Sequence, residues 1–336
     1  MDAVGTRAGL AINAGHGYAK IVLIADGHVQ RVTLPALVGQ AHQQLAGALQ
    51  RIQNVEVGGR AWWVGDDALI SRNPLTALNQ ERIKDPIFIP ALVRGALSQL
   101  ASNGVDITET IREAMCVTGL PATWSTDKEL AGALVHRLKE AAPLGSVRVI
   151  AEPLGLLYAE LLDDDGEIAG EPALQQGRVA VVDLGHHTVD VGVMEHLVPV
   201  PTSLVTYQLG TARPLQVMQQ RLSAAFEVEL PLYKVDQAVR SGTIRLGGVE
   251  EALPTGWDAP FYENGREIAS RLVEAWGGSG RQFDAVLIGG GGVEIPALVE
   301  ALQARFTHAR PVPDGQLAIA LGYARLARRL GKAHER

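Results

Sequence analysis

The chain has 336 residues, enough for roughly two domains that each bury a sizeable core. Its formal net charge is −7, so no overall positive field draws it to nucleic acid or anionic lipid, and a role on DNA would go through a partner. The single cysteine, Cys116, excludes an intrachain disulfide. Together with the lack of a signal-peptide pattern or a membrane-length apolar run, this predicts a cytoplasmic protein.

The N-terminal part of the chain predicts two hairpins. Apolar runs interrupted by glycine indicate strand, turn and strand over residues 9–27, and residues 28–39 continue the same sheet. A second hairpin is expected over 55–69, with Gly58 and Gly59 at its turn.

Helices and strands then alternate. Residues 86–102 have helical spacing, and a helix over 125–141 is expected to begin with Ser125 or Thr126 as N-cap. Buried strands are predicted over 111–121 and 147–153, and a helix follows at 154–162. This alternation is typical of α/β layers.

The C-terminal part repeats the pattern. The acidic segment 163–177, rich in Gly and Pro, is predicted as a surface loop. Strand, turn and strand recur from Val179, and residues 210–275 are mainly helical. Residues 283–306 indicate a strand, a run of glycines and a helix, and one more helix closes the chain.

Two segments match at an offset of 170 residues, from position 13 to position 183. They are "LAINAGHGYAKIVLI" and "VVDLGHHTVDVGVM", and the matched pairs are Asn13 with Asp183, Gly15 with Gly185 and His16 with His186. Matched hairpins in two halves predict a duplicated α/β fold, with two α/β domains around a cleft.

The chemistry of these turns indicates a site for a polyphosphate and a metal ion. A tip that contains glycine can aim several backbone N–H groups at one anion, whereas a carboxylate just before the tip suits Mg²⁺. We therefore expect Asp183 to hold Mg²⁺, with Asn13 as the second residue facing the metal and the nucleotide. The expected phosphate-binding residues are Gly15, His16, Gly17 and Lys20 in the first turn and Gly185, His186, His187 and Thr188 in the second.

The histidines of these turns have two interpretations. Adjacent histidines at a strand end point to opposite faces, so we expect them to donate to phosphate oxygens or line the turn, and not to form a transition-metal site.

A third glycine site follows a buried strand, and its flat backbone can carry a purine ring or a ribose. Its residues are Gly289, Gly290, Gly291 and Gly292.

These motifs together resemble those of the actin superfamily of ATPases, and within it the bacterial and archaeal actin-like proteins of the ParM kind. The resemblance rests on "NAGHGYAK", "VTGLP", "AEP", "DLGHHTVD" and "IGGGG", and it spans residue 10 to about 328. It implies an actin-like fold that binds ATP, or another NTP, with Mg²⁺. It also implies a homopolymeric filament that moves plasmid DNA through a DNA-binding adaptor, without contacting nucleic acid or membrane directly.

The resemblance also implies the domain boundaries. Domain I would span 1–150, with 315–336 returning to it and a small insert at about 33–74. Domain II would span 151–314, with a smaller subdomain at about 210–275.

Glu152 is the expected catalytic residue. A strand delivers it to the ligand side of the sheet, where a carboxylate can orient a water for attack on a γ-phosphate. The alternative is an acid favoured by the positive end of a helix. Gly155 and Gly322, inside predicted helices, indicate a close helix crossing that acts as a hinge or as simple tight packing.

Two other functions stay open. A small-molecule kinase of the same fold would need a substrate pocket and a base in the first half, and the insert there is short. A nucleotide-binding assembly scaffold that does not polymerise is favoured by Asn13, because the family usually has Asp at that position.

Overall fold

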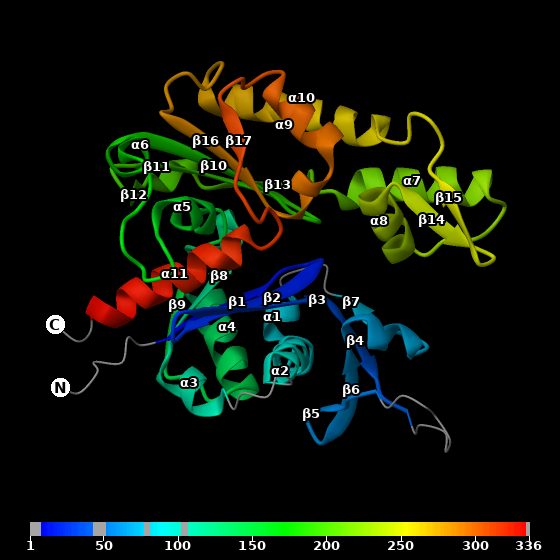
Figure 1. The fold of residues 1–336 in the computed structure, drawn as a ribbon, viewed down its shortest axis with the longest axis horizontal. Coiled ribbons are helices and arrows are strands. Elements are labelled where there is room, and N and C mark those ends of the chain that lie inside the picture. Colours follow the sequence, from blue (N-terminus) through cyan, green and yellow to red (C-terminus); the bar gives the residue numbers. More distant parts are fainter. Residues whose placement is uncertain (1–7, 43–51, 77–80, 102–106, 334–336) are drawn as a thin grey trace. The chain divides into compact units, whose positions relative to one another are not determined.

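The computed structural model describes residues 8–42, 52–76, 81–101 and 107–333. They form two compact units (Figure 1). Unit 1 runs to Glu171 and resumes at Ile319, and unit 2 comprises Pro172–Ala318. The change of unit comes after Glu171, later in the chain than the boundary expected at residue 150.

The main sheet of unit 1 has five strands in the order β3-β2-β1-β8-β9. Its central strand β1 pairs antiparallel with β2 and parallel with β8, and β8 pairs parallel with β9. The bounds are β1 Gly9–Ala14, β2 Tyr18–Ala25, β3 His28–Pro35, β8 Met115–Leu120 and β9 Ser146–Ala151. The hairpin predicted over 9–27 is confirmed.

A second sheet in unit 1 has the order β5-β6-β4-β7. Its strands are β4 Leu37–Gln40, β5 Val55–Val57, β6 Arg60–Val64 and β7 Leu75–Thr76. Gly58 and Gly59 both have positive φ at the turn between β5 and β6, which confirms the second predicted hairpin. The helical segments of unit 1 are η1 Gly65–Ile70, α1 Glu81–Lys84, α2 Phe88–Ala101, α3 Thr108–Glu113, η2 Ala122–Trp124, α4 Lys128–Ala141, α5 Leu154–Leu161 and α11 Ala318–Ala333.

The main sheet of unit 2 follows the same order as that of unit 1. When β13, which also pairs with β11, is set aside, the remaining strands lie in the order β12-β11-β10-β16-β17, so in both sheets the third, second, first, fourth and fifth strands lie side by side. The bounds are β10 Arg178–Leu184, β11 Val189–Glu195, β12 Val198–Pro199, β13 Val205–Tyr207, β16 Ala285–Gly289 and β17 Ala309–Pro311. The duplication expected from the matched hairpins is therefore confirmed.

Helices cover the sheet of unit 2, and a small hairpin extends from them. The helical segments are α6 Pro172–Gln176, η3 Pro201–Ser203, α7 Ala212–Ala225, α8 Leu232–Ser241, α9 Ala259–Trp276, η4 Gly291–Glu294 and α10 Pro296–Gln303. The hairpin consists of β14 Thr243–Leu246 and β15 Val249–Ala252. Every helix in the described ranges is too short or too polar to cross a lipid bilayer.

Each unit has its own apolar core. In unit 1, side chains of β1 and β2 pack with α2 and α4, as Leu10, Ile21, Leu92 and Leu134 show. In unit 2, β10 and β16 pack with α9 and α10, for which Phe261 and Leu298 are fully buried representatives.

Five local predictions are wrong. Residues 37–39 belong to β4 of the second sheet and do not continue the first sheet, and residues 111–113 belong to helix α3 and not to a buried strand. The N-cap of α4 is Asp127, whose carboxylate accepts from the backbone N–H groups of Glu129 and Leu130, in place of Ser125 or Thr126. Strand β9 lies at the sheet edge and buries only its last residue, Ala151, so it is not a buried strand. The predicted loop 163–177 contains α6.

The acidic segment before α6 is attached to the C-terminal helix of its own unit. Arg325 and Arg328 of α11 form ion pairs with Asp164 and Asp165, and Lys332 pairs with Glu167. This segment is therefore a charged strap over α11 as well as a surface loop.

Helices α5 and α11 cross closely at two glycines. A Cβ added to Gly322 would lie 1.9 Å from the carbonyl oxygen of Gly155 and 2.7 Å from the backbone nitrogen of Ala159. A Cβ at Gly155 would lie 2.9 Å from the carbonyl oxygen of Ile319. The close crossing is confirmed, and movement about it stays a prediction.

We expect Gly322→Ala to lower the free energy of unfolding by at least ~1–3 kcal/mol, because the added methyl meets rigid backbone. Urea unfolding followed by circular dichroism measures this. The matched control is Gly132→Ala in α4, where nothing lies within 4 Å of the added Cβ and the higher helix propensity of Ala should be neutral or stabilising. Equal effects at the two positions would contradict a tight crossing.

Candidate functional site

The hairpin tip between β1 and β2 in unit 1 is built by close backbone packing. A Cβ at Gly15 would lie 2.9 Å from the carbonyl oxygen of Tyr18 and 3.3 Å from Oδ1 of Asn13. Asn13 is buried, and Lys20 lies directly opposite it on β2. The tip thus combines a neutral amide with one cation, a combination that suits an anion.

Glu152 lies at the same edge of the unit 1 sheet as this tip. Strands β1, β8 and β9 are parallel, so their carboxyl ends meet at one edge. The Thr118 hydroxyl donates to the carbonyl oxygen of Ile12 at 2.6 Å, and the Glu152 backbone N–H donates to that of Leu120 at 2.8 Å. The end of the hairpin strand and the candidate catalytic carboxylate therefore belong to one hydrogen-bonded framework.

The hairpin tip of unit 2 has the same construction with opposite charge. A Cβ at Gly185 would lie 2.8 Å from the carbonyl oxygen of Thr188, as at Gly15 and Tyr18. Asp183 lies directly opposite Asp190 in the strand register. An acidic pair therefore occupies the positions that Asn13 and Lys20 hold in unit 1, and carboxylate oxygens are the ligands that Mg²⁺ prefers.

The two aspartates differ in their surroundings. Asp190 accepts hydrogen bonds from the hydroxyls of Thr188 and Thr206 at 2.7 Å and 2.6 Å. This leaves the backbone N–H of Thr188, rather than its hydroxyl proton, as the group that can donate to phosphate. Gly290 packs against Asp183, since a Cβ there would lie 2.1 Å from Asp183 Oδ1.

The tip of unit 2 is fixed by the chain that leads into α7. The carbonyl oxygens of Gly185, His186 and His187 accept from the backbone N–H groups of Thr211, Ala212 and Gly210, at 3.1, 2.7 and 3.1 Å. A Cβ at Gly210 would lie 2.3 Å from the carbonyl carbon of His187, so only glycine fits there. Gly210 was not among the predicted site residues, and its signal in the sequence was a glycine just before a helix.

His186 is neutral at physiological pH. Burial, and to a smaller extent His187, lower its pKa to about 4, although Asp236 acts in the opposite direction. The expected role of His186 toward phosphate is therefore limited to a neutral N–H donor, without a positive charge.

The glycine run after β16 serves mainly packing. Gly290 has a φ of 84° and meets Asp183, while a Cβ at Gly292 would lie 2.7 Å from Cβ of Leu184. At Gly291 an added Cβ would meet only Arg240 and Gln316, at ordinary contact distances of 3.6 Å and more. A flat backbone surface was expected from all four glycines. Of the three glycines compared here, only Gly291 offers such a surface.

Arg240 of α8 connects the small helical region to this glycine. Its Nη1 donates to the carbonyl oxygen of Gly291 at 3.2 Å and pairs with Glu294, and its Nε donates to Asp236 at 3.1 Å. Asp236 and Arg240 were not among the predicted site residues, although their helical spacing of four residues permits such a pair.

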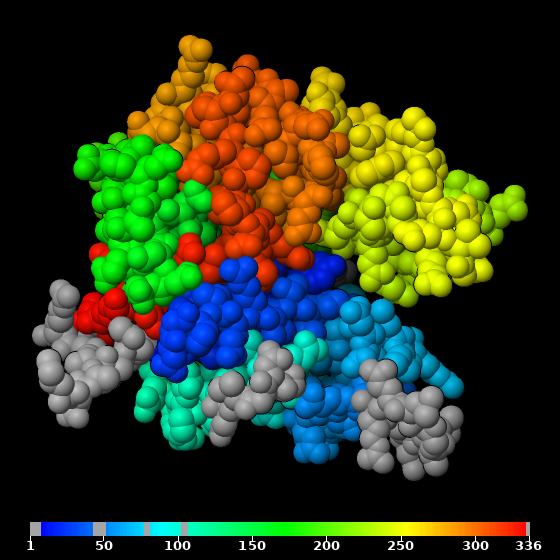
Figure 2. Space-filling view, in the orientation of Figure 1, coloured from blue at the N-terminus to red at the C-terminus, as the bar shows by residue number. Residues whose placement is uncertain are grey.

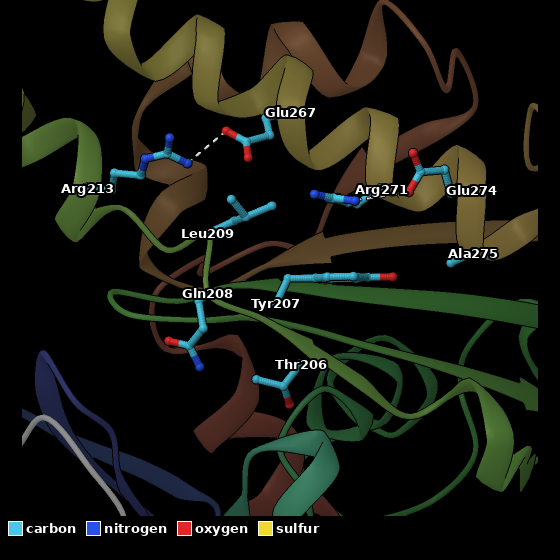
Figure 3. A pocket seen from close by; sticks show the side chains of 9 residues that line it. All are labelled: Thr206, Tyr207, Gln208, Leu209, Arg213, Glu267, Arg271, Glu274 and Ala275. Carbon is cyan, nitrogen blue, oxygen red and sulfur yellow. Dashed lines mark hydrogen bonds and ion pairs between the residues drawn. The ribbon is translucent and has the colours of Figure 1, made fainter.

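A pocket of about 700 Å³ lies elsewhere on unit 2, between β13 and α9 (Figure 3). Two arginines and two glutamates line it, and Arg213 pairs with Glu267 at 2.8 Å. Tyr207 and Leu209 supply its apolar part. The charges of the lining cancel, so this pocket has no surplus of positive charge for a polyphosphate.

The fold and the two hairpins define an actin-like protein, and comparisons with known proteins agree. A family model described as "Actin like proteins N terminal domain" matches residues 11–155. Another, described as "Archaeal actin homologue MreB-like, C-terminal", matches residues 181–303. The chain belongs to the actin-like proteins of the actin superfamily. A comparison of the sequence with curated proteins finds no match.

Solved structures of bacterial and archaeal actin-like proteins share the fold. A ParM filament of 15 strands from Clostridium botulinum has a TM-score of 0.69 and 17% identity, covering 97% of this chain and 99% of that one. An archaeal actin homolog in complex with ADP has a TM-score of 0.70 and 17% identity, and the match covers 96% of this chain and 99% of that one. Bacillus thuringiensis ParM with AMPPNP has a TM-score of 0.64 and 14% identity, and the match covers 98% of this chain and 100% of that one.

We expect the free energy of unfolding to fall as the pH drops from 7 to 4.5, in part through His186. The unfolded histidine takes up a proton near pH 6.5, whereas the folded one does so only near 4, so acid favours the unfolded chain. This contribution is ~2 kcal/mol at pH 4.5. Urea unfolding at pH 7 and pH 4.5 measures this, and the free energy of unfolding should fall less in His186→Gln than in the wild type. Exposed His136→Gln is the control and should behave as the wild type. An equal loss in the wild type and in His186→Gln would contradict a neutral His186.

Proposed function

We propose that this protein binds ATP together with Mg²⁺, hydrolyses it and assembles into filaments that become unstable after hydrolysis. The observation that carries the proposal is the repeated hairpin register, with an Asn13–Lys20 pair in unit 1 and an Asp183–Asp190 pair in unit 2. Each tip would contribute to nucleotide binding. The tip with a cation supplies charge to the phosphates, and the acidic tip holds the metal.

The proposed site residues divide into three roles. Backbone N–H groups at Gly15, His16 and Gly17 and at Gly185, His186, His187 and Thr188 would hold phosphate oxygens. Asp183 would face Mg²⁺ through its retained waters, and Asn13 would accept from one of these waters. Glu152 would orient the water that attacks the γ-phosphate.

The base and ribose would lie against unit 2. Gly291 offers backbone that no side chain covers closely, and Arg240 and Asp236 border it with a donor and an acceptor. Gly289, Gly290 and Gly292 would support this wall from within. The pairing of Arg240 with both Asp236 and Glu294 keeps the guanidinium plane in one orientation.

Filament formation is proposed from the fold that the chain shares with ParM proteins. A ParM with this fold forms a 15-stranded filament. Transport of plasmid DNA through a DNA-binding adaptor in the cytoplasm is the finer proposal, supported by the net charge of −7, which disfavours direct DNA contact. The alternative, a scaffold that binds nucleotide without polymerising, is favoured by Asn13.

The direct test measures phosphate release and pelleting of the full chain with and without ATP and Mg²⁺. We expect both signals with ATP and neither without it. Glu152→Gln should bind nucleotide normally and release phosphate about 10²-fold more slowly, and its filaments should last longer. The matched control, Glu113→Gln in α3, changes an exposed glutamate.

The outcomes separate the candidate functions. Nucleotide binding without hydrolysis or pelleting over a wide range of salt and protein concentrations would favour the scaffold. Hydrolysis with equal rates in Glu152→Gln and the wild type would remove Glu152 from the mechanism.

Asn13→Asp should strengthen the use of Mg²⁺. A carboxylate there adds a charge toward the metal, worth ~1–3 kcal/mol at an effective dielectric near 20. Lys20 lies directly opposite and offsets part of that charge, so we expect a gain near the lower end, about tenfold in the Mg²⁺ concentration for half-maximal hydrolysis.

A magnesium titration of ATP hydrolysis measures this shift. Exposed Asn73→Asp adds the same charge away from the hairpin and should leave the titration unchanged. Weaker ATP binding without faster hydrolysis in Asn13→Asp would show that the site requires a neutral residue at this position.

A further inference from the structure

The hairpin tip of unit 1 contacts a tryptophan from another segment of the same unit. The ring centroids of His16, at the tip, and Trp124, in η2, lie 6.0 Å apart, and the two ring planes make an angle of 71°. This is an edge-to-face pair, one of the arrangements that aromatic rings prefer. Both side chains are only half-buried, so the pair lies at the surface of unit 1, beside the backbone proposed to bind phosphate.

The register of the sheet brings these two residues together. Ile12 of β1 is paired with Thr118 of β8, and the two strands are parallel, so both lead to the same edge of the sheet. Four residues further along, the chain has reached His16 in the tip and Ala122 at the start of η2. Trp124 is the last residue of η2. The contact therefore follows from strand pairing as well as from the orientation of two side chains.

The backbone of Trp124 is attached on both sides. Its N–H donates to the carbonyl oxygen of Pro121 at 2.9 Å, and its own carbonyl oxygen accepts from the N–H of Asp127 at 3.0 Å. Asp127 is the N-cap of α4, and the Ser125 hydroxyl donates to the carbonyl oxygen of Ala122 at 2.7 Å. The indole thus reaches the tip from a turn that is fixed between β8 and α4.

The two tips of the molecule are attached by different means. In unit 2, three carbonyl oxygens of the tip accept from the backbone that leads into α7. In unit 1, the carbonyl oxygen of Gly17 accepts from the N–H of Ala36 at 2.9 Å, and the ring of His16 packs against Trp124. A side-chain contact thus contributes in unit 1 to the attachment that backbone hydrogen bonds provide in unit 2.

We propose that Trp124 is a positioning residue for nucleotide binding, which holds His16, and with it the tip of unit 1, in the conformation that binds phosphate. The inference rests on the proposed function of this tip. A tip that is ordered before the ligand arrives loses less conformational entropy on binding, so its affinity is higher. Because the tip would contact phosphate equally before and during the reaction, a loss of this order should raise KM and spare kcat.

The test compares Trp124→Leu, which removes the aromatic ring, with Trp124→Phe, which keeps one. The measurements are the Kd of the full chain for AMPPNP with Mg²⁺, by equilibrium dialysis, and kcat for ATP. We expect Trp124→Leu to raise Kd about 3- to 10-fold with kcat within about twofold, and Trp124→Phe to recover most of the affinity. A wild-type Kd in Trp124→Leu would overturn the inference.

A second comparison asks whether Trp124 acts through His16. In the His16→Ala background, Trp124→Leu should raise Kd by less than about twofold further, because the side chain that it holds is already gone. A tryptophan that only stabilises the fold would cause the same loss of affinity in both backgrounds, and this result would overturn the inference.

The matched control is a second histidine–tryptophan pair in unit 1, away from the tip. The rings of His42 and Trp63 lie 5.8 Å apart at an angle of 85°, and Trp63 belongs to β6 of the second sheet. His42→Ala removes the exposed histidine of that pair and should leave the Kd for AMPPNP unchanged. A Kd raised equally by His42→Ala and His16→Ala would overturn the inference, because the effect would then not depend on the tip.

A thermal-unfolding cycle over His16→Ala, Trp124→Leu and the double variant tests the contact without nucleotide. We expect the melting temperature of the double variant to fall by less than the sum of the two single losses, because each single variant already breaks the same contact. An additive cycle would overturn the inference. A wild type that shows this coupling but binds no nucleotide would contradict the proposed function and still support the holding of His16 by Trp124.

Discussion

The candidate site of unit 2 depends on how three carbonyl oxygens of a hairpin tip are held. Gly185, His186 and His187 direct their carbonyls to the backbone that leads into α7, and this contact exists because Gly210 has no side chain. With the carbonyls engaged on that side, the tip is a fixed backbone surface and not a mobile turn. The burial of His186, and with it the low pKa that keeps its ring neutral, follows from the same anchoring.

The duplication of the fold does not extend to its charges. Both sheets have the same strand order, and both tips use a glycine against the carbonyl oxygen three residues later. Between these shared features, the cross-strand pair is an amide with an ammonium in one unit and two carboxylates in the other. The backbone geometry is thus a common scaffold, and two positions on it decide whether the tip carries a cation or two carboxylates.

The sequence predicted the repeated parts of the fold and missed features that depend on distant contacts. The two hairpins, the strand before the glycine run and the closing helix follow from local apolar patterns and glycine positions. By contrast, the edge position of β9 depends on which strands surround it, and the choice of Asp127 as N-cap over Ser125 is decided by backbone conformation at the helix start. Asp236 and Arg240 lie far in sequence from the glycine run that they border, so no local pattern marks them as part of a site.

The discontinuity of unit 1 has a consequence for the order in which the chain folds. Its last helix, α11, follows the whole of unit 2, and the tight places at Gly9 and Gly322 are filled only when that helix packs. During synthesis, unit 2 is complete once Ala318 has emerged, while unit 1 still lacks the helix that its glycines and its acidic strap are shaped to receive. The larger part of unit 1 therefore leaves the ribosome before unit 2 but completes its packing only after α11 has emerged.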